Sequence, residues 1–315
     1  MQHEITQAIP LLDEQGELTQ PGWARRLLPV YDRSRVRGGP LRLKERDCYL
    51  VMNRQCALAL TISDNRYMGM DSISLIDLWE GWQVTRSPMR LMPLGGTGLP
   101  QSSLRGSCAR AGRGYGLLFQ HEGEGRTLHA HMDRFRDGQA LDAQILLTQE
   151  PEESIVMCTP FEKPGQFYFN QKINCMRAQG KVTLGDREYV FDPEDSFAVL
   201  DWGRGVWTCR STWYWGSASG MVDGVPFGFN IGYGFGDTSA ATENALFYGG
   251  KLHKLSQVTF HIPRKNGREH YLAPWTFDSD DRRFRMKFRP ILDRAACPSA
   301  GVVRSGQHQV FGLSL

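Results

Sequence analysis

The sequence has no long apolar run and no recognisable export signal. No apolar stretch approaches the roughly 20 residues that a helix needs to cross a bilayer. The N-terminal stretch, MQHEITQAIPLLDEQGEL, carries acidic side chains and lacks the apolar core of a signal peptide. We therefore expect a soluble, cytoplasmic protein without a membrane span.

The sequence also has little excess of charge of either sign. Its 37 lysines and arginines nearly balance its 34 aspartates and glutamates, which leaves a net charge of +3. A nucleic-acid-binding protein needs a clustered basic face. The richest basic run, residues 282–289, alternates its charges with Phe and Met side chains, as a half-buried strand does. We therefore expect no nucleic-acid partner.

Cysteine is scattered and shows no pairing pattern. The cysteines number seven, an odd count without a C-x-x-C pair, so no disulfide framework is indicated. In a reducing compartment they would be mostly small buried hydrophobes. They are Cys48, Cys56, Cys108, Cys158, Cys175, Cys209 and Cys297. Cys158 follows an apolar run and has no obvious activating partner, which argues against a thiol nucleophile.

Helical periodicity is likewise absent. No window keeps a 3.6-residue apolar period, whereas alternating and β-rich runs recur between turn residues. Only in residues 71–82 does a short amphipathic helix compete with a strand. Gly249-Gly250 suits a two-residue hairpin loop. The predicted strands are 41–44, 49–62, 67–78, 116–120, 127–135, 143–147, 154–158, 166–175, 177–182, 187–191, 205–217, 226–235, 244–248, 251–262, 269–277, 283–289 and 307–313.

So many short strands predict an all-β, antiparallel fold. About eight strands already close a small barrel, and the predicted strands exceed that number. We therefore predict two β-barrels packed side by side, with a boundary in the polar stretch 192–196 that divides the chain into 1–195 and 196–315. Residues 95–116, rich in Gly, Ser and Arg, are predicted to form a long loop, and such loops are often functional lids.

Candidate functional residues concentrate between Leu200 and Asn244. Of the eight tryptophans, four fall at the start of this segment: Trp202, Trp207, Trp213 and Trp215. Large aromatic side chains anchor barrel cores, so core packing is favoured for each of them. Contact with a ligand is the alternative.

The motif DWGRG, residues 201–205, brings an acid and a base together in this segment. Glycines on both sides of Arg204 indicate a bulge or a close backbone approach. We expect Asp201 and Arg204 to form a charge-assisted pair. The slightly favoured interpretation is a buried structural bridge, and the alternative is a positioned acid–base or anion-binding pair.

The run PFGFNIGYGFG, residues 226–236, predicts a strand with one apolar face and one nearly bare face that carries Asn230. A bare face lets another backbone, a tryptophan or a ligand come close. The G-x-G spacing resembles a nucleotide loop, but these glycines lie inside a strand pattern and open no helix. We therefore reject dinucleotide binding and expect no cofactor.

Polar residues cluster again at 237–244, where the next strand begins. Thr242, Glu243 and Asn244 could orient a ligand and exchange a proton at the mouth of a barrel. They could equally satisfy backbone groups at a strand end, and the sequence favours neither alternative.

His129 and His131 share one strand face, as the ligands of some metal sites do. A metal site needs a third ligand, and the sequence marks none. Solvent-facing histidines are therefore favoured, and no metal site is predicted.

Several motifs resemble family 2804 of the bacterial domains of unknown function: FAVLDWGRGVW, WYWGSASG, GFNIGYGFGD, ATENALFYGGKLHKL, PFEKPGQFYFNQKINCMRAQGKV, PGWARR and ALTISD. This family is similar to the hydroxyneurosporene-synthase and AttH-like group, which implies two lipocalin-like barrels, a pocket for an apolar ligand and acid–base chemistry without a cofactor. The resemblance also implies a hairpin after residue 312 that is missing here. The second barrel would then lack its last strand, and a homo-oligomer could form through the open edge.

Three functions remain open. The first is an enzyme-like pocket for an apolar or amphipathic small molecule, in which Asp201 or Glu243, with a raised pKa, acts as general acid or base. Arg204 and Asn230 would orient the ligand. The second is a non-catalytic lipid or hydrophobic-ligand binding protein with the same pocket. The third is carbohydrate binding or cleavage, which also uses aromatics and two carboxylates.

Overall fold

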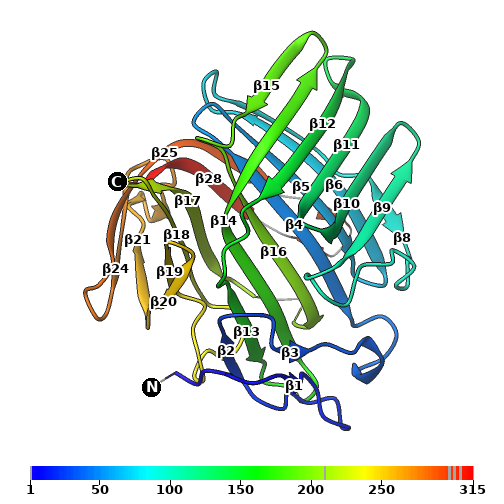
Figure 1. Cartoon of the computed structure of the whole chain (residues 1–315), viewed down its shortest axis with the longest axis vertical. Helices are drawn as coiled ribbons and strands as arrows, with labels where there is room; N and C mark the ends of the chain where they lie inside the picture. Colours follow the sequence, from blue (N-terminus) through cyan, green and yellow to red (C-terminus); the bar gives the residue numbers. More distant parts are fainter. Residues whose placement is uncertain (1, 209–210, 297–298, 301–302, 305–306, 315) are drawn as a thin grey trace.

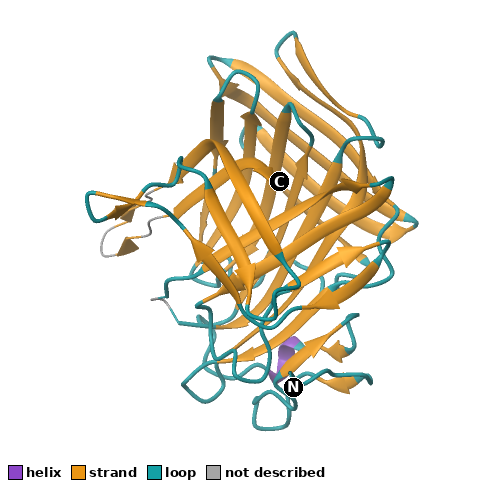
Figure 2. Cartoon of the chain, turned by 90° about the vertical axis from the view of Figure 1, so that its left-hand side faces the viewer, coloured by secondary structure: helices purple, strands orange, loops and turns teal. Residues whose placement is uncertain are grey.

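The computed structural model describes residues 2–208, 211–296, 299–300, 303–304 and 307–314. Nearly all regular structure within them is β-strand, and the helical part is one short 3-10 turn, η1 at Arg33–Arg35 (Figure 2). The prediction of an all-β fold is confirmed. No helix among the described residues is long and apolar enough to span a membrane.

One large antiparallel sheet takes up most of the chain before residue 207. Its strands pair in the order β7-β6-β5-β4-β16-β14-β12-β11-β10-β9, with β8 added to β6, β13 and β15 added to β14, and β2 added to β13. Their bounds are β2 Gly22–Ala24, β4 Lys44–Met52, β5 Cys56–Asp64, β6 Met68–Asp77, β7 Trp82–Arg86, β8 Met89–Leu91, β9 Gly106–Gly112, β10 Tyr115–Gly123, β11 Gly125–Arg136, β12 Gln139–Thr148, β13 Ile155–Pro160, β14 Phe167–Leu184, β15 Arg187–Phe191 and β16 Phe197–Val206.

The large sheet curls around one core. Leu58 of β5 and Leu128 of β11, far apart in the strand order, belong to the same buried cluster. In Figure 1 the green strands β11 and β12 accordingly lie in front of the blue strands β4 and β5. Strand alternation sets what points inward: Leu128 and Ala130 are buried, whereas His129 and His131 face outward. The described pairing runs from β7 to β9 without closing, so the two lipocalin-like barrels stay a prediction.

The rest of the chain forms two four-stranded sheets and small hairpins. The sheets pair in the orders β17-β18-β19-β20 and β21-β24-β25-β28. Their bounds are β17 Tyr214–Val222, β18 Val225–Tyr233, β19 Ala245–Tyr248, β20 Lys251–Lys254, β21 Val258–His261, β24 Trp275–Ser279, β25 Arg285–Ala296 and β28 Gln307–Ser314. The remaining pairs are β1 Ile9–Pro10 with β3 Pro29–Val30, β22 Arg264–Lys265 with β23 Arg268–Glu269, and β26 Ser299–Ala300 with β27 Val303–Arg304.

The C-terminal sheets cover part of the outer face of the large sheet. Leu292 of β25 and Phe311 of β28 pack on Ala57 and Ile76. This second layer explains why β5 is buried on both faces while β11 alternates with solvent. Farther along the same face, Asn174 of β14 donates hydrogen bonds to main-chain carbonyls of β17 and β18. The outer face of β14, β16 and β4 is therefore an interface between sheets.

The strand pairing decides one open alternative and corrects two local predictions. The predicted strand 67–78 is confirmed as β6 over the competing short helix at 71–82, since β6 and β7 pair across a turn there. The predicted loop 95–116 contains β9, which pairs with β10. The predicted strand 205–217 is two strands, because β16 ends at Val206 and β17 begins at Tyr214.

Two predictions about the larger organisation stay open. The division into 1–195 and 196–315 stays a prediction, although β16 still belongs to the large sheet and the chain passes to the smaller sheets after Val206. Among the described strands β28 pairs with β25 alone. A homo-oligomer through that edge stays a prediction as well.

Candidate functional site

β16 carries Asp201 and Arg204 on opposite faces. Side chains alternate along a strand, so residues three positions apart point to opposite sides. The inward face of β16 holds Trp202 and Arg204, and the outward face holds Asp201 and Gly203. The predicted pair between Asp201 and Arg204 is therefore wrong, and each side chain has other partners.

Arg204 lies inside the large sheet and is wholly buried. Its Nη1 is 2.8 Å from Asp47 Oδ1, and its Nε is 3.6 Å from Glu45 Oε1. Its guanidinium carbon lies 4.2 Å from the centre of the Trp202 ring. Arg33 Nε bonds the same Glu45 carboxylate at 2.9 Å. Trp202 and Arg204, for which ligand binding was the alternative to a structural role, are thus held within the interior of the large sheet.

Asp201 lies on the other side of β16, between Lys172 of β14 and Arg46 of β4. The strand register places Lys172 directly opposite Asp201. One carboxylate oxygen accepts a hydrogen bond from Lys172 Nζ, and the other accepts from Arg46 Nη2. Burial raises the pKa of Asp201, but the two cations outweigh burial and hold that pKa below its usual range. Asp201 is therefore an ionised, paired carboxylate and lacks the raised pKa expected of a general acid.

A row of contacts leads from Lys172 to Glu243. Burial lowers the pKa of Lys172, but the Asp201 carboxylate reverses this effect, so the pKa is raised and the ammonium stays protonated. Lys172 Nζ lies 5.0 Å from the centre of the Trp215 ring. Trp215 Nε1 donates to Asn230 Oδ1 at 2.7 Å, and Asn230 Nδ2 donates to Glu243 Oε2 at 3.0 Å.

These residues form a single group, which we call the inter-sheet cluster. The large sheet supplies its two cations, Asp201 and Tyr168, while β17, β18 and the loop before β19 supply Trp215, Asn230 and Glu243. Its members are Arg46, Tyr168, Lys172, Asp201, Trp215, Asn230 and Glu243.

Glu243 differs from Asp201 in its partners. Its carboxylate accepts a hydrogen bond from Asn230, and it forms no ion pair with any residue that the structure describes. Its Oε1 packs over Gly232, where an added Cβ would come within 2.5 Å of that oxygen. The bare face of β18 therefore makes room for a half-buried carboxylate that has one oxygen fixed and no direct ion pair among the described residues. The nearby ammonium groups of Lys172 and Lys254 act on it only through longer-range charge interactions.

Thr242 and Asn244 serve the fold. Asn244 Oδ1 accepts from the Gly232 N–H at 2.7 Å, and its Nδ2 donates to the Ser256 carbonyl at 2.9 Å. Thr242 Oγ1 donates to the same carbonyl at 2.6 Å. These bonds satisfy backbone groups beside the start of β19. Of the two alternatives drawn from the sequence, Thr242 and Asn244 thus fit the structural one.

Trp207 and Trp213 lie between β16 and β17, in an aromatic cluster centred on Phe235. The Phe235 ring lies 4.9 Å from Tyr168, 5.3 Å from Phe161, 5.6 Å from Trp213 and 6.0 Å from Trp207, between ring centres. Trp213 is 49% exposed, so the aromatic cluster reaches the surface. Because Tyr168 belongs to both clusters, an apolar surface adjoins the charged groups.

Three members of the inter-sheet cluster are not predicted from the sequence: Arg46, Tyr168 and Lys172. A lysine inside the apolar strand pattern FYFNQKINC is a signal that could have singled out Lys172. Solvent reaches the inter-sheet cluster in spite of the covering sheets. The Arg46 side chain is 40% exposed, and Tyr168 and Trp215 are half-buried.

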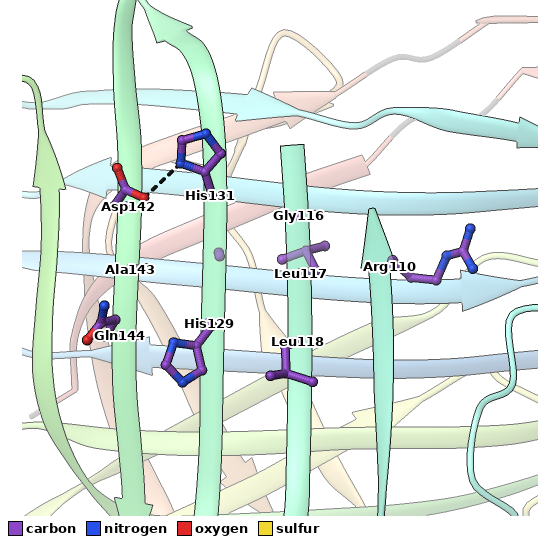
Figure 3. A pocket seen from close by; sticks show the side chains of 10 residues that line it. Arg110, Gly116, Leu117, Leu118, His129, His131, Asp142, Ala143 and Gln144 are labelled. Carbon is purple, nitrogen blue, oxygen red and sulfur yellow. Dashed lines mark hydrogen bonds and ion pairs between the residues drawn. The ribbon is translucent and has the colours of Figure 1, made fainter. Parts of the chain in front are cut away.

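A separate hollow of about 320 Å³ lies on the outer face of β9 to β12 (Figure 3). His129 and His131 line it, on the outer face where solvent-facing histidines were predicted. The ring nitrogens of His131 bond Asp142 at 2.7 Å and Asp133 at 2.8 Å, and these bonds raise the pKa of His131. No three metal-ligating side chains are arranged to hold an ion in the described ranges of the chain.

Solved structures of similar fold exist. A putative AttH from Nitrosomonas europaea has a TM-score of 0.50 at 11% identity, over 85% of this chain and 86% of that chain. Kievitone hydratase from Nectria haematococca has a TM-score of 0.49 at 11% identity, over 97% of both chains. CghA with Sch210972 has a TM-score of 0.47 at 12% identity, over 97% of this chain and 93% of that chain. At such low identity the likeness to the AttH structure shows a common fold alone.

Sequence comparison identifies a family. No curated protein matches the sequence. A family described as a domain of unknown function, DUF2804, matches residues 2–313, which confirms the resemblance predicted from the motifs. The chain therefore belongs to the DUF2804 family.

Proposed function

We propose that the inter-sheet cluster binds an apolar or amphipathic small molecule and that Glu243 exchanges a proton with it. The reaction would be a cofactor-independent hydration, isomerisation or cyclisation. The contrast between two carboxylates carries this proposal. Asp201 is neutralised by direct ion pairs with Lys172 and Arg46, whereas Glu243 is oriented by Asn230 and makes no direct ion pair in the described part of the chain, with Lys172 and Lys254 acting on it from a distance. A general acid or base must be held in position and must also be available to exchange a proton, which a carboxylate held between two cations is not.

The groups around Glu243 suit proton transfer to or from an organic ligand. Burial raises the pKa of the Tyr168 phenol, and the Asp201 charge adds to this effect, so the phenol stays protonated. Tyr168 and Lys172 can therefore donate hydrogen bonds to a ligand oxygen on which negative charge develops. Glu243 would take a proton from a neighbouring carbon, or return it there, while the aromatic cluster covers the apolar part of the ligand.

The test compares small molecules that remain bound to the wild-type protein and to Glu243→Gln. Gln keeps an amide oxygen that can accept from Asn230 but cannot transfer a proton. We expect native mass spectrometry and solvent extraction to give product from the wild type and unconverted substrate from the variant. A difference of one water molecule would indicate hydration, and isomers of equal mass would indicate isomerisation or cyclisation. Consistently empty preparations of both proteins would contradict the proposal.

The alternative is a binding protein without catalysis. It is favoured by Asp201, Thr242 and Asn244, because the contacts of all three side chains stabilise the fold. This alternative predicts the same ligand in the wild type and in Glu243→Gln. The carbohydrate alternative needs a second carboxylate free to act on the ligand, and Asp201 is less suited to that role while two cations hold it.

A further inference from the structure

The strongest unexplained feature of this region is Arg294, which enters from the covering sheet. Arg294 lies on β25, two residues after Leu292, so both side chains face the large sheet. Its Nη1 donates to Ser74 Oγ of β6 at 2.7 Å and lies 3.5 Å from Thr85 Oγ1 of β7. The guanidinium is therefore sandwiched between β25 and the outer face of the large sheet.

Arg294 has no acidic partner in the described part of the chain. Its hydrogen-bond partners are the neutral hydroxyls of Ser74 and Thr85, and it forms no ion pair with a described residue. The Arg294 side chain is half-buried, and this burial lowers its pKa. A partly buried cation without a counter-ion is costly, and a bound anion would remove that cost.

A second unsatisfied group faces the same space. Gln309 of β28 lies directly opposite Arg294 in the strand pairing, so the two side chains share a face. Gln309 Oε1 is buried without a hydrogen-bond partner among the described residues. Since the oxygen and nitrogen of an amide exchange by rotation, this group can present either an acceptor or N–H donors to a ligand.

Arg294 is continuous with the inter-sheet cluster through Cys48. Cys48 of β4 lies directly opposite Asp201 of β16. Thr61 of β5 donates a hydrogen bond to Cys48 Sγ at 3.2 Å and lies directly opposite Ser72 of β6. Ser72 is two residues before Ser74, the partner of Arg294, so Arg294 and Asp201 lie over one continuous outer face of the large sheet.

The charges along this surface leave a surplus. Its cations are Arg46, Lys172 and Arg294, and its carboxylates are Asp201 and Glu243. Lys254 lies beside Glu243 as a further basic group, although burial lowers its pKa to about 7. The surface therefore has at least one positive charge in excess, which an anionic group would neutralise.

We propose that the ligand of the inter-sheet cluster is an amphipathic monoacid whose anionic head group is bound by Arg294 and Gln309. Arg46, through the N–H groups that Asp201 does not use, is the second donor within reach. The apolar part of the ligand then lies along Trp215 towards the aromatic cluster. This assignment rests on the proposed function and adds to it the chemical class of the ligand.

The test uses two fluorescent probes with the same rings, 8-anilinonaphthalene-1-sulfonate, which is an anion, and N-phenyl-1-naphthylamine, which is neutral. Both are titrated into the full chain and into Arg294→Met. We expect Arg294→Met to lower the affinity for the anionic probe by about tenfold or more, because a charge-assisted hydrogen bond is lost. The affinity for the neutral probe should stay unchanged. Arg294→Lys should restore part of the anion affinity. Arg289→Met, at an exposed arginine of the same strand, is the matched control.

The outcomes separate this inference from the proposed function. If Arg294→Met lowers the affinity for both probes equally, or for neither, the anion site is overturned and the pocket stands. A wild-type protein that binds neither probe overturns the pocket and the anion site together. Thermal unfolding of each variant shows whether a lost signal reflects lost folding, and in that case the Arg294→Lys titration decides.

Discussion

The two faces of β16 show two ways of burying charge. On the inward face, Arg204 is enclosed with Asp47 and Glu45, and each carboxylate has a guanidinium partner. On the outward face, Asp201 is compensated in the same manner, but the surface beside it also holds Glu243 and Arg294, which make no direct ion pair with any described residue. A network with a structural role needs an ion-pair partner for every buried charge. Where some charges lack such a partner on a surface that solvent reaches, a bound ligand can supply it.

The energetic consequence is a difference in what each face tolerates. Removing one partner from a buried ion pair leaves an unpaired charge in a medium of low polarity, which is strongly destabilising. A carboxylate that has no ion pair can be neutralised at far lower cost to the fold. Substitutions on the two faces should therefore differ sharply in their effect on stability.

The largest effect is expected for Arg204→Met. This change leaves Glu45 without its Arg204 contact and strips Asp47 of its ion-pair partner, so we expect a loss of about 3–5 kcal/mol in the free energy of unfolding, or no folded protein. Urea unfolding measures it. Lys181→Met, which removes an exposed pair with Glu188, is the control and should cost less than about 1 kcal/mol. Equal stability of the two variants would show that the interior network is not structural.

A smaller loss is expected for Lys172→Met. Asp201 keeps Arg46 as a partner, and Met fills much of the space of the lysine stem, so the expected cost is about 1–3 kcal/mol. The measurement is urea unfolding of Lys172→Met, Asp201→Asn and the double variant. The two single effects should couple, because the side chains touch. Simple additivity would speak against the pairing of these two groups.

The acid side of the stability curve should respond to Asp201. Its folded pKa is lowered below the unfolded value, so its contribution is fully present above the unfolded pKa near 4 and is lost as pH falls through the folded pKa. Melting temperatures between about pH 5 and pH 2 should fall less steeply for Asp201→Asn than for the wild type. Parallel curves would mean that Asp201 is not held as an ionised partner of Lys172 and Arg46.

The smallest change in stability is expected for Glu243→Gln. Glu243 has no described ion pair to lose and Gln can keep the bond from Asn230, so the free energy of unfolding should change by less than about 1 kcal/mol. The measurement is urea unfolding of Glu243→Gln in parallel with Arg204→Met, so that the two losses in unfolding free energy can be compared. A loss as large as that of Arg204→Met would make Glu243 part of the architecture and would remove the contrast between the faces.

The fold was accessible from the sequence because strand alternation is local. Apolar and polar residues exchange every second position in β11, and this pattern alone indicates an inner and an outer face. The same rule contains the evidence against an Asp201–Arg204 pair, since a separation of three in a strand puts the two side chains on opposite faces. Closeness along the chain suggested a pair that strand geometry forbids.

The site required the sheet register. Asp201 meets Lys172 across 29 positions of sequence and Arg46 across 155 positions, and neither partner stands out near Asp201 in the chain. Glu243 was a candidate from its polar surroundings, but its lack of a direct ion pair depends on which cations Asp201 already holds. Arg294 and Gln309 enter the same space only because β25 and β28 fold back over the large sheet.

The sequence by itself determined an all-β chain, its membership of the DUF2804 family and the segment that holds Asp201, Asn230 and Glu243, because alternation, turn residues and motifs are properties of neighbouring positions. The tertiary structure alone decided which charges are compensated. Electrostatic compensation depends on distances of a few ångströms between groups that the register of β14, β16 and β4 brings together, and on the burial that the covering sheets impose.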